Sequence, residues 1–369
     1  MKLLYVVARA EYFLSHRLEL AHDARVAGFE IAVATTDFSE NDHNRLNDIK
    51  NFFIRFKRGS INPITEIKTV IDLVKVFKKF RPNIVHNVSL KPALYCAMIA
   101  RFYGTTSINS INGFGYIFTS NQLKAKLLRP IIRLALKFLL NRSDVHVIVQ
   151  NSQDYQDCSA LLPKCKLYLI AGSGVNVKAF TPTTYHGVFT FTLVARMLWS
   201  KGIGEFVEAA QIFKFKNPDA NVRFLLVGSP DSENPESVPE ETLKNWHNTK
   251  IIEWVAHTDK VSAIYAQTSV AVLPSYREGM PKSLLEAMAC GLPVITTNAR
   301  GCDDLVQHGV NGLKAPVKDV DALFKLMEEC YQNPSNCIIM GENARRSALN
   351  IYATEVINKE ILEVYKNAR

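Results

Sequence analysis

The sequence predicts an α/β protein made of two doubly wound parallel-sheet domains in series, and three observations support this prediction. Short apolar runs alternate with amphipathic stretches of roughly 12 to 20 residues along the whole chain, which is the pattern of βαβ units. The series starts again near residue 190, after a polar stretch that contains Gly172 and Gly174. The length of 369 residues also suits two domains, because a domain holds about 150 residues on average.

The predicted strands are short and apolar, and turn residues bound them. They cover residues 3–8, 31–35, 84–86, 107–111 and 145–149 in the first half, and 190–195, 223–227, 251–254, 270–273 and 294–297 in the second. The predicted helices cover residues 13–26, 65–80, 92–102, 123–141, 204–215 and 284–289. Buried parallel strands of this kind need helices on both faces of their sheet.

We therefore expect an N-terminal Rossmann-like domain over residues 1–170, a linker over 171–188 and a second Rossmann-like domain over 189–350. Residues 351–369 are predicted to form a helix that packs back toward the N-terminal domain. Ligands of such sheets bind beyond the carboxyl ends of the strands. Two facing domains of this type form a cleft with two half-sites, which suits an enzyme that joins two substrates.

The composition excludes several classes of protein. Hydrophobic residues make up 47% of the chain and charged residues 21%, as in folded globular proteins. No apolar run approaches the roughly 20 residues that span a bilayer, and residues 1–8 are too short for the core of a signal peptide. The seven cysteines lack Cys-x-x-Cys spacing, which favours a reducing cytoplasm over a zinc or disulfide framework.

The net charge of +9 is concentrated in the first half of the chain. Residues 1–170 hold 24 Lys and Arg against 13 Asp and Glu, whereas the remainder holds 20 against 22. Such a one-sided charge indicates an anionic partner, which is a membrane surface, a nucleic acid or a phosphorylated substrate. A solvated basic face without a partner is the alternative.

The basic stretch 124–140 mixes aliphatic residues with cations at helical spacing, and further cations precede it in the chain. These further cations are Lys75, Lys78, Lys79 and Arg81. We predict peripheral attachment to the inner, cytoplasmic face of an anionic membrane. The alternative is a helix that faces the core and has a solvated cationic side. Nucleic acid is disfavoured because no platform of stacking aromatic residues accompanies the charges.

The strongest candidate site is the segment 274–293, which follows a predicted strand and opens a helix. Pro281 suits the first turn of a helix, and Gly279 lets the backbone approach a ligand closely. The free N–H groups at this helix start form an anion site. Glu278 and Glu286, at the mouth of that site, can accept hydrogen bonds from sugar hydroxyls. The alternative is that they are two unrelated surface glutamates.

The second candidate site is the segment 195–202, which follows the first strand of the second half. Arg196 can fork onto two oxygens, and Lys201 adds a point charge, so the pair suits a diphosphate. Ordinary surface charge is the alternative for each residue taken alone.

Together, Arg196-x4-Lys201 and Glu278-x7-Glu286 resemble the motifs of the retaining glycosyltransferases of family 4, which have the GT-B fold. The resemblance covers essentially the whole chain. It is greatest with bacterial enzymes of lipopolysaccharide, O-antigen, capsule and N-glycan assembly. Such enzymes often move an N-acetylhexosamine from a UDP-sugar to a polyprenyl-diphosphate-linked sugar. The resemblance implies a transferase with an N-terminal acceptor-binding domain and a C-terminal donor-binding domain.

The resemblance also implies roles for individual residues. Arg196 and Lys201 would neutralise the donor diphosphate, which is electrostatic catalysis. Glu286 would accept the ribose hydroxyls, and Glu278 would face the transferred sugar as a catalytic residue. The remaining donor-side candidates are the loop residues Gly279, Met280, Pro281 and Lys282, the backbone amides of Ser283 and Leu284, and Val255 beside the nucleotide base.

On the acceptor side the resemblance is weaker. His16 opens a helix after the first strand, and Gly113 and Gly115 would let the backbone approach the donor. Asn112 stands where several relatives carry a histidine, so it can only donate or accept a hydrogen bond. His86 is a further catalytic candidate at a strand mouth, although a lone histidine there is more often structural.

No cofactor and no divalent metal are expected. No Asp-x-Asp directly follows a predicted strand, and the resemblance implies metal independence, with Arg196 and Lys201 in the place of the cation. The pair Asp303-Asp304 is interpreted as helix capping. Two alternatives stay open: a non-hydrolysing UDP-N-acetylglucosamine 2-epimerase, and a catalytically silent scaffold. A dehydrogenase is disfavoured because no Gly-x-Gly-x-x-Gly follows the first strand.

Overall fold

The computed structural model divides the chain into two compact units, each built on a parallel sheet. Unit 1 comprises residues 1–173 and 357–369, and unit 2 comprises residues 174–356. The structure describes residues 1–39, 42, 44–46, 49–57, 62–111, 123–182, 187–232 and 234–368, with the backbone alone for 123–128. The predicted α/β class with two Rossmann-like sheets is confirmed.

The sheet of unit 1 has seven parallel strands in the order β3-β2-β1-β4-β5-β6-β7. These are β1 (Lys2–Val6), β2 (Glu30–Thr35), β3 (Lys50–Phe53), β4 (Ile84–Val88), β5 (Thr106–Ile111), β6 (Val145–Val149) and β7 (Lys166–Leu169). The central strands β1, β4, β5 and β6 are almost wholly buried, as expected of parallel strands covered on both faces. In β4 and β5 the buried residues include several polar side chains.

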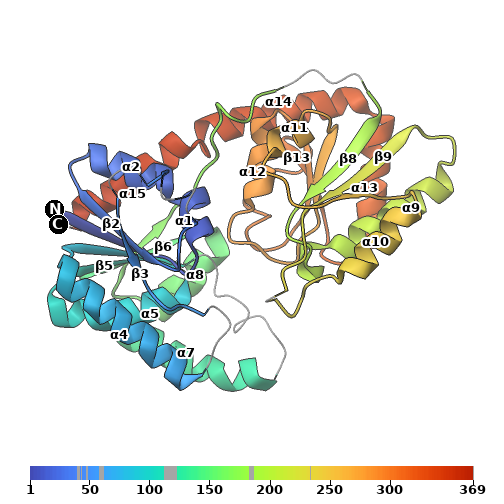
Figure 1. Cartoon of the computed structure of the whole chain (residues 1–369). Coiled ribbons are helices and arrows are strands. Elements are labelled where there is room, and N and C mark those ends of the chain that lie inside the picture. The colour runs from blue at the N-terminus through green and yellow to red at the C-terminus, as the bar shows by residue number, and fades with distance from the viewer. Residues whose placement is uncertain are drawn as a thin grey trace. The chain divides into compact units, whose positions relative to one another are not determined.

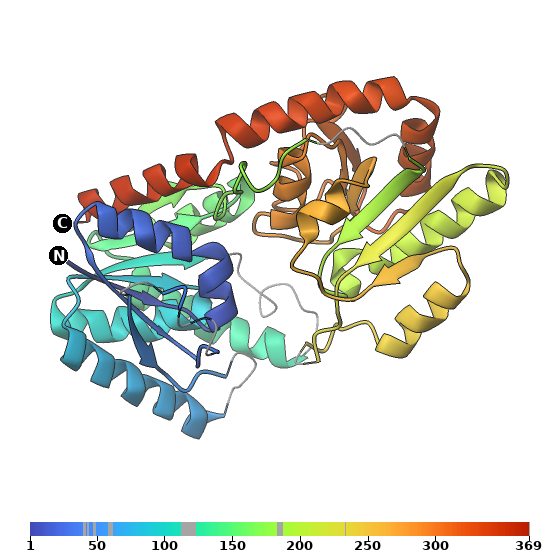
Figure 2. The ribbon, with the colours of Figure 1, turned by 45° about the horizontal axis from the view of Figure 1, so that its top comes forward.

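Helices cover both faces of this sheet (Figures 1 and 2). On one side lie α1 (Ala10–His16), α2 (Leu18–Val26) and α15 (Thr354–Asn367), and on the other α4 (Pro63–Phe80), α5 (Leu90–Tyr103), α7 (Leu123–Leu140) and α8 (Ser152–Leu161). The alternation of β1 assigns the faces, because Leu3 and Tyr5 pack with the first set, whereas Leu4 and Val6 pack with the second.

A buried polar network ties α15 to the sheet of unit 1. His86 is fully buried in β4, and its Nδ1 lies 2.5 Å from the hydroxyl of Tyr365 on α15. Its Nε2 lies 2.7 Å from the hydroxyl of Ser110, and Tyr365 in turn contacts the hydroxyl of Tyr5 at 3.1 Å. Both ring nitrogens of His86 therefore have protein partners away from solvent. The expectation of a catalytic His86 is corrected, because the residue is structural.

The sheet of unit 2 has six parallel strands in the order β10-β9-β8-β11-β12-β13. These are β8 (Phe189–Val194), β9 (Val222–Val227), β10 (Glu253–Val255), β11 (Val270–Leu273), β12 (Val294–Thr297) and β13 (Gly312–Ala315). The strand order reverses between β8 and β11, so these two strands form the switch point of the sheet, and sheets of this kind bind ligands beyond the carboxyl ends of such strands.

The helical segments of unit 2 are η1 (Trp199–Lys201), α9 (Ile203–Lys216), α10 (Glu240–Asn248), α11 (Val261–Tyr265), α12 (Lys282–Ala289), α13 (Val320–Gln332) and α14 (Pro334–Asn350). A cluster of aromatic rings joins α9 to the sheet, with Phe191 and Phe224 stacked at 5.5 Å between ring centroids and Phe213 edge-on to both. Figure 1 shows α12 on the opposite side of this sheet from α9.

Several local expectations were wrong. The helix predicted over residues 13–26 is two helices, because Arg17 leaves helical geometry between α1 and α2. The strands β3, β7 and β13 were not predicted; each has only four residues and lies at or near a sheet edge. Asp303 does not cap a helix: residues 300–305 form turns, and its carboxylate accepts a hydrogen bond from Lys314 at 2.6 Å.

The burial of His86 predicts a pH dependence of stability. Burial lowers the pKa of His86 well below its ordinary value of 6.5. Below pH 6.5 His86 is therefore protonated in the unfolded chain but not in the folded chain. As the pH is lowered, the free energy of unfolding falls by up to about 1.4 kcal/mol per pH unit. Urea titrations between pH 5 and 7.5 should show a smaller slope in His86→Gln than in the wild-type chain.

A second histidine with a lowered pKa, His146, provides an internal control. Burial also lowers the pKa of His146, to about 4, so part of the pH slope should remain in His86→Gln. Equal slopes in the wild-type chain and the variant would contradict the prediction.

Candidate functional site

The candidate site lies at the carboxyl ends of the strands of unit 2, where the loops after β8 and β11 touch. The backbone N–H of Tyr276 donates to the carbonyl of Ser200 at 2.9 Å. Gly202 has a φ of +74°, and a Cβ there would lie 2.2 Å from the carbonyl oxygen of Pro274. Only glycine allows this approach, so the two segments singled out in the sequence meet at the switch point.

An ion pair joins these two segments. The Nζ of Lys201 lies 2.5 Å from Oε1 of Glu278, and the two side chains are only 19% and 11% exposed. The buried hydroxyl of Ser275 contacts the same carboxylate oxygen at 2.8 Å. The structure thus brings together the cation of one motif and the first carboxylate of the other, largely shielded from solvent.

The loop after β12 also holds the backbone around Glu278. The N–H of Glu278 donates to the carbonyl of Arg300 at 2.9 Å. Gly301 has a φ of +77°, and a Cβ there would lie 2.4 Å from the carbonyl oxygen of Glu278 and 2.6 Å from that of Gly279. Three strand ends therefore position one carboxylate.

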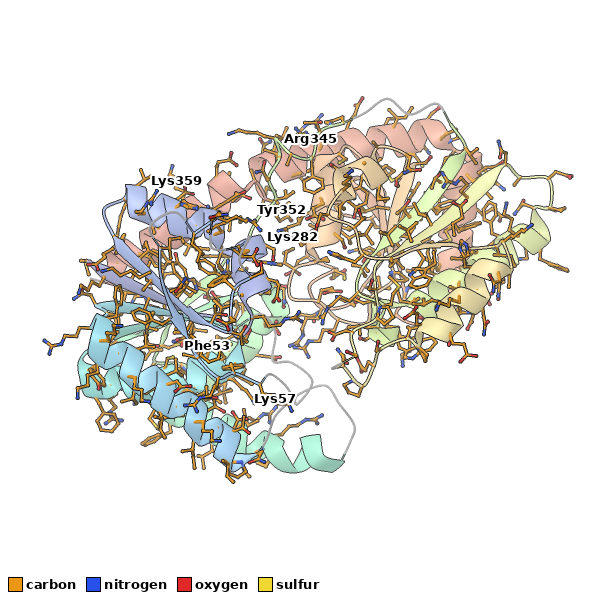
Figure 3. All side chains as sticks on the ribbon, viewed as in Figure 1. Phe53, Lys57, Lys282, Arg345, Tyr352 and Lys359 are labelled. Carbon is orange, nitrogen blue, oxygen red and sulfur yellow. The ribbon has the colours of Figure 1, made fainter. Side chains whose placement is uncertain are left out.

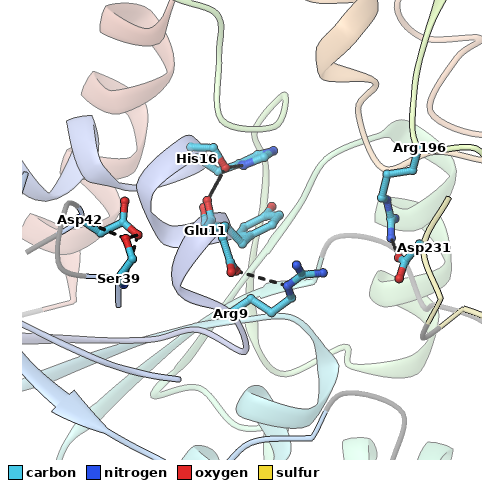
Figure 4. Close-up of polar contacts among 9 residues, drawn as sticks. Arg9, Glu11, His16, Ser39, Asp42, Arg196 and Asp231 are labelled. Atoms are coloured by element: carbon cyan, nitrogen blue, oxygen red, sulfur yellow. Dashed lines mark hydrogen bonds and ion pairs between the residues drawn. The ribbon is translucent and has the colours of Figure 1, made fainter. Parts of the chain in front are cut away.

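Arg196 lies on the loop after β8 but has a different partner from Lys201. Its guanidinium donates to Asp231 at 2.6 Å (Figure 4). The loop that carries Asp231 comes close because a Cβ at Gly228 would lie 1.9 Å from the carbonyl oxygen of Ala195. Nearby, the N–H of Gly228 donates to the carbonyl of Val255 at 2.9 Å, which places the partly exposed Val255 at the end of β10.

The helix α12 begins within this site. Pro281 is its N-cap, and Lys282, labelled in Figure 3, is its first residue. The N–H of Leu284 donates to the carbonyl of Pro281 at 3.1 Å, and the carbonyl of Ser283 accepts from the hydroxyl of Tyr265 at 2.6 Å. The expectation that the Leu284 amide is free for an anion is corrected, because this amide already has an acceptor.

Glu286 lies one turn further along α12 and is half-buried. Burial raises its pKa from 4.5 to about 7, and the positive charge of Lys282 lowers it only partly. Within the described part of the chain its carboxylate accepts no hydrogen bond. Such a carboxylate gains most from a ligand that donates hydroxyl groups, because these would satisfy oxygens that have left water.

The predicted acceptor-side residues belong to unit 1 or fall outside the description. His16 ends α1, where its ring stacks on Tyr12 at 4.1 Å between centroids and its Nδ1 contacts the hydroxyl of Ser15 at 2.7 Å. Asn112, Gly113 and Gly115 lie outside the described residues.

Two residues of the site were missed in the sequence. Ser275 lies within the predicted segment 274–293 but has no role assigned to it there, and Asp231 lies outside both predicted segments. Both follow a strand of the same parallel sheet, Ser275 after β11 and Asp231 after β9. A search for polar residues after every predicted strand of the second half would have found them.

The glycine at position 301 provides a test of how the Glu278 backbone is held. Gly301→Ala should lower the free energy of unfolding by about 1–3 kcal/mol more than Gly309→Ala. Gly309 is a matched control because its φ is also +77°, whereas a Cβ there would meet nothing within 4 Å. Urea unfolding of both variants measures the difference. Equal losses of unfolding free energy would contradict the prediction, because they would show that the loop after β12 can move away at no cost.

The raised pKa of Glu286 predicts a second pH effect, opposite in sign to that of His86. Between pH 4.5 and about 7 the folded chain holds a proton that the unfolded chain has released, so stability falls as the pH rises. Glu286→Gln removes this penalty and should stabilise the protein by on the order of 2 kcal/mol at pH 8 and little at pH 5. Urea unfolding at both pH values tests this. The exposed Glu208→Gln is the control, and a gain that is independent of pH would refute the prediction.

Comparison with known proteins extends these observations to the whole chain. Residues 2–157 match the family described as glycosyl transferase 4-like, and residues 178–347 match glycosyl transferases group 1. Over 332 residues the chain is 26% identical to an N,N'-diacetylbacillosaminyl-diphospho-undecaprenol alpha-1,3-N-acetylgalactosaminyltransferase of Campylobacter jejuni, covering 86% of this chain and 85% of the relative.

A second relative agrees with this match, and a solved structure shows the same fold. A UDP-Gal:alpha-D-GlcNAc-diphosphoundecaprenol alpha-1,3-galactosyltransferase of Escherichia coli is 26% identical over 326 residues, which are 82% of this chain and 80% of the relative. The sucrose-phosphate synthase of Thermosynechococcus elongatus superposes with a TM-score of 0.83 at 19% identity, covering 100% of this chain and 98% of that one. The chain is therefore a glycosyltransferase of the GT-B fold, in which a glycosyl transferase 4-like region precedes a glycosyl transferases group 1 region.

Proposed function

We propose that this enzyme transfers a sugar, an N-acetylhexosamine, from a UDP-sugar to a polyprenyl-diphosphate-linked glycan, with retention of the anomeric configuration. The observation that carries the proposal is the shielded pair of Lys201 and Glu278 at the switch point of unit 2. The activities of the Campylobacter jejuni and Escherichia coli relatives support the acceptor class, and that of the second also supports a UDP donor. The product would enter a surface polysaccharide or a related glycan.

Unit 2 would bind the donor, with its diphosphate beside Arg196 and Lys201. Each cation now has a carboxylate partner, Asp231 and Glu278 respectively, which keeps the charge in place without a ligand. A diphosphate would compete for both cations, and its bridging oxygen gains negative charge as the bond to the sugar breaks. Preorganised cations in a shielded site stabilise that charge, which is the main catalytic effect we assign to this chain. The proposal needs no divalent metal.

Carboxylates and backbone groups would bind the rest of the donor, which comprises the transferred sugar, the ribose and the base. Glu278, once Lys201 turns to the diphosphate, would accept hydrogen bonds from the hydroxyls of the transferred sugar. Glu286 would accept the ribose hydroxyls, in agreement with its unsatisfied carboxylate. Gly279 and Met280 would line the sugar, and the N-terminal end of α12 from Pro281 to Ser283 would face the phosphates. Val255 would border the base.

In the reaction, the bond between the anomeric carbon and the diphosphate oxygen breaks, and UDP leaves as the anion. A hydroxyl oxygen of the acceptor forms the new glycosidic bond, and its proton passes to the departing diphosphate. Unit 1 would bind this acceptor, with His16 and the segment of Asn112, Gly113 and Gly115 as its candidate contacts. A polyprenyl-linked acceptor lies in a membrane, so we place the enzyme at the inner face of the cytoplasmic membrane.

Turnover of a panel of UDP- and GDP-sugars with a polyprenyl-diphosphate-sugar acceptor, in EDTA, tests the proposal. Lys201→Ala should lower kcat by on the order of 10²–10³, because it removes one charge that stabilises the leaving group. Glu278→Ala should also abolish most turnover. Arg223→Ala is the matched control, since it breaks a 2.7 Å ion pair with Glu253 in the same unit without touching the site, and it should stay within about threefold of wild type.

Three outcomes would contradict parts of the proposal. Full activity of Lys201→Ala would refute the role of the ion pair. Activity that EDTA abolishes and Mg²⁺ restores would refute metal independence. Inversion of the anomeric configuration, seen by NMR of the product linkage, would refute retention.

A further inference from the structure

The helix α4 carries apolar side chains on the face that points away from the sheet. Ile64, Ile67, Ile71 and Val74 are all exposed, although isoleucine and valine are usually buried. Their spacing of three, four and three residues puts them on one stripe of the helix. The buried stripe of the same helix, which includes Leu73 and Phe77, packs on the sheet. The helix is therefore apolar on two opposite faces, only one of which the fold uses.

The neighbouring helices continue this surface. On α7 the side chains of Ile131, Leu134 and Phe138 are exposed at the same helical spacing, the last two by 70% and 69%. Between α4 and α7 lies α5, which contacts both helices and exposes Phe102 by 83%. All three helices cover the same face of the sheet (Figures 1 and 2). We call these side chains the apolar helix face.

Positive charge surrounds the apolar helix face. Its exposed cations are Lys68, Lys75, Lys78, Lys79, Arg101, Arg133 and Lys137. The three helices hold only two acidic residues, and both are engaged with other cations. Glu66 binds Lys91 at 3.0 Å, and Asp72 binds Arg55 at 2.6 Å. The outward charge is thus of one sign, interleaved with large aliphatic side chains.

We propose that the apolar helix face docks on an anionic lipid bilayer, with α4, α5 and α7 lying in the plane of the interface. Aliphatic side chains would enter the boundary between headgroups and acyl chains, and the flanking lysines and arginines would contact lipid phosphates. A protein partner of opposite charge would need carboxylates spaced to match both stripes, whereas a fluid anionic surface fits any spacing. Among the described helices none is long and apolar enough to cross a bilayer.

The proposal that the partner is a membrane rests on the proposed function, because a polyprenyl-linked acceptor lies in a membrane. Docking of the apolar helix face can nevertheless be measured without catalysis. Flotation of the full chain with vesicles of phosphatidylcholine and phosphatidylglycerol (3:1) at 150 mM salt measures docking. Pure phosphatidylcholine vesicles should bind at least tenfold less protein, because the cations then lack anionic partners.

Two sets of variants separate the apolar and the electrostatic contributions. Ile67→Ser with Leu134→Ser and Phe138→Ser should lower the partition coefficient at least tenfold. Lys75→Gln with Lys78→Gln and Lys137→Gln should lower it by about fivefold per charge at low salt. Matched controls lie in unit 2: Phe215→Ser, at a side chain that is 87% exposed, and Lys244→Gln with Lys260→Gln and Lys325→Gln should bind vesicles as the wild type does.

Flotation of both variant sets at the wild-type level, or no binding of wild type to anionic vesicles, would overturn the proposal. A dimer that the serine variants dissociate, seen by light scattering without vesicles, would assign the face to a second copy of this chain and also overturn it. Binding of UDP, measured by calorimetry on the same variants, should be unchanged. Loss of flotation with intact UDP binding separates this surface from the donor site, and failure of UDP binding in the wild type would instead count against the proposed function.

Discussion

The site of unit 2 depends on the close approach of two loops that follow neighbouring strands. Parallel strands bring their carboxyl ends to one edge of a sheet, but they do not bring side chains into contact by themselves. Contact requires that the loop after β8 cross the loop after β11 at backbone distance, which Gly202 allows beside Pro274. Gly301 and Gly228 do the same for the loops after β12 and β9. Each of these glycines has a positive φ, so conformation and lack of space both exclude a side chain there.

This arrangement also sets the electrostatics of the site. Lys201 and Glu278 are both largely shielded, and charges taken out of water must be paired or hydrogen-bonded. Ser275 adds a hydrogen bond to the pair, whereas Glu286 receives no such support and shows the cost as a raised pKa. A group that is less stable than it would be in water has the most to gain from a ligand. Under the proposed function, the ribose hydroxyls of the donor would satisfy this carboxylate.

Unit 1 distributes its polar groups differently. Among its described residues, three buried side-chain atoms have no hydrogen-bond partner: Arg17 Nε, Thr35 Oγ1 and Asn87 Oδ1. The buried side chains of Tyr5, His86, Ser110 and Tyr365, in contrast, satisfy one another inside the unit. They tie the last helix of the chain to the first sheet, so that residues 357–369 belong to the unit that the N-terminus begins. Its outer face, however, exposes large aliphatic side chains and cations on the described parts of α4 and α7. The buried network stabilises the fold, whereas the exposed side chains of α4 and α7 can contact a surface outside the chain.

The sequence by itself determined the fold class, the two sheets and the two motifs of unit 2, because apolar periodicity and strand–loop–helix order are local properties of the chain. It did not determine the edge strands β3, β7 and β13, since each contains a lysine and does not form the apolar run that marked β11 and β12, which are equally short. Nor did it reveal that His86 is enclosed, because its partner Tyr365 lies 279 residues away. Lys201 and Glu278 were each predicted as site residues, but only the tertiary structure joined them into an ion pair with Ser275. The reason is that pairing across a switch point depends on how closely two backbones pass, and that distance is set by the packed sheet.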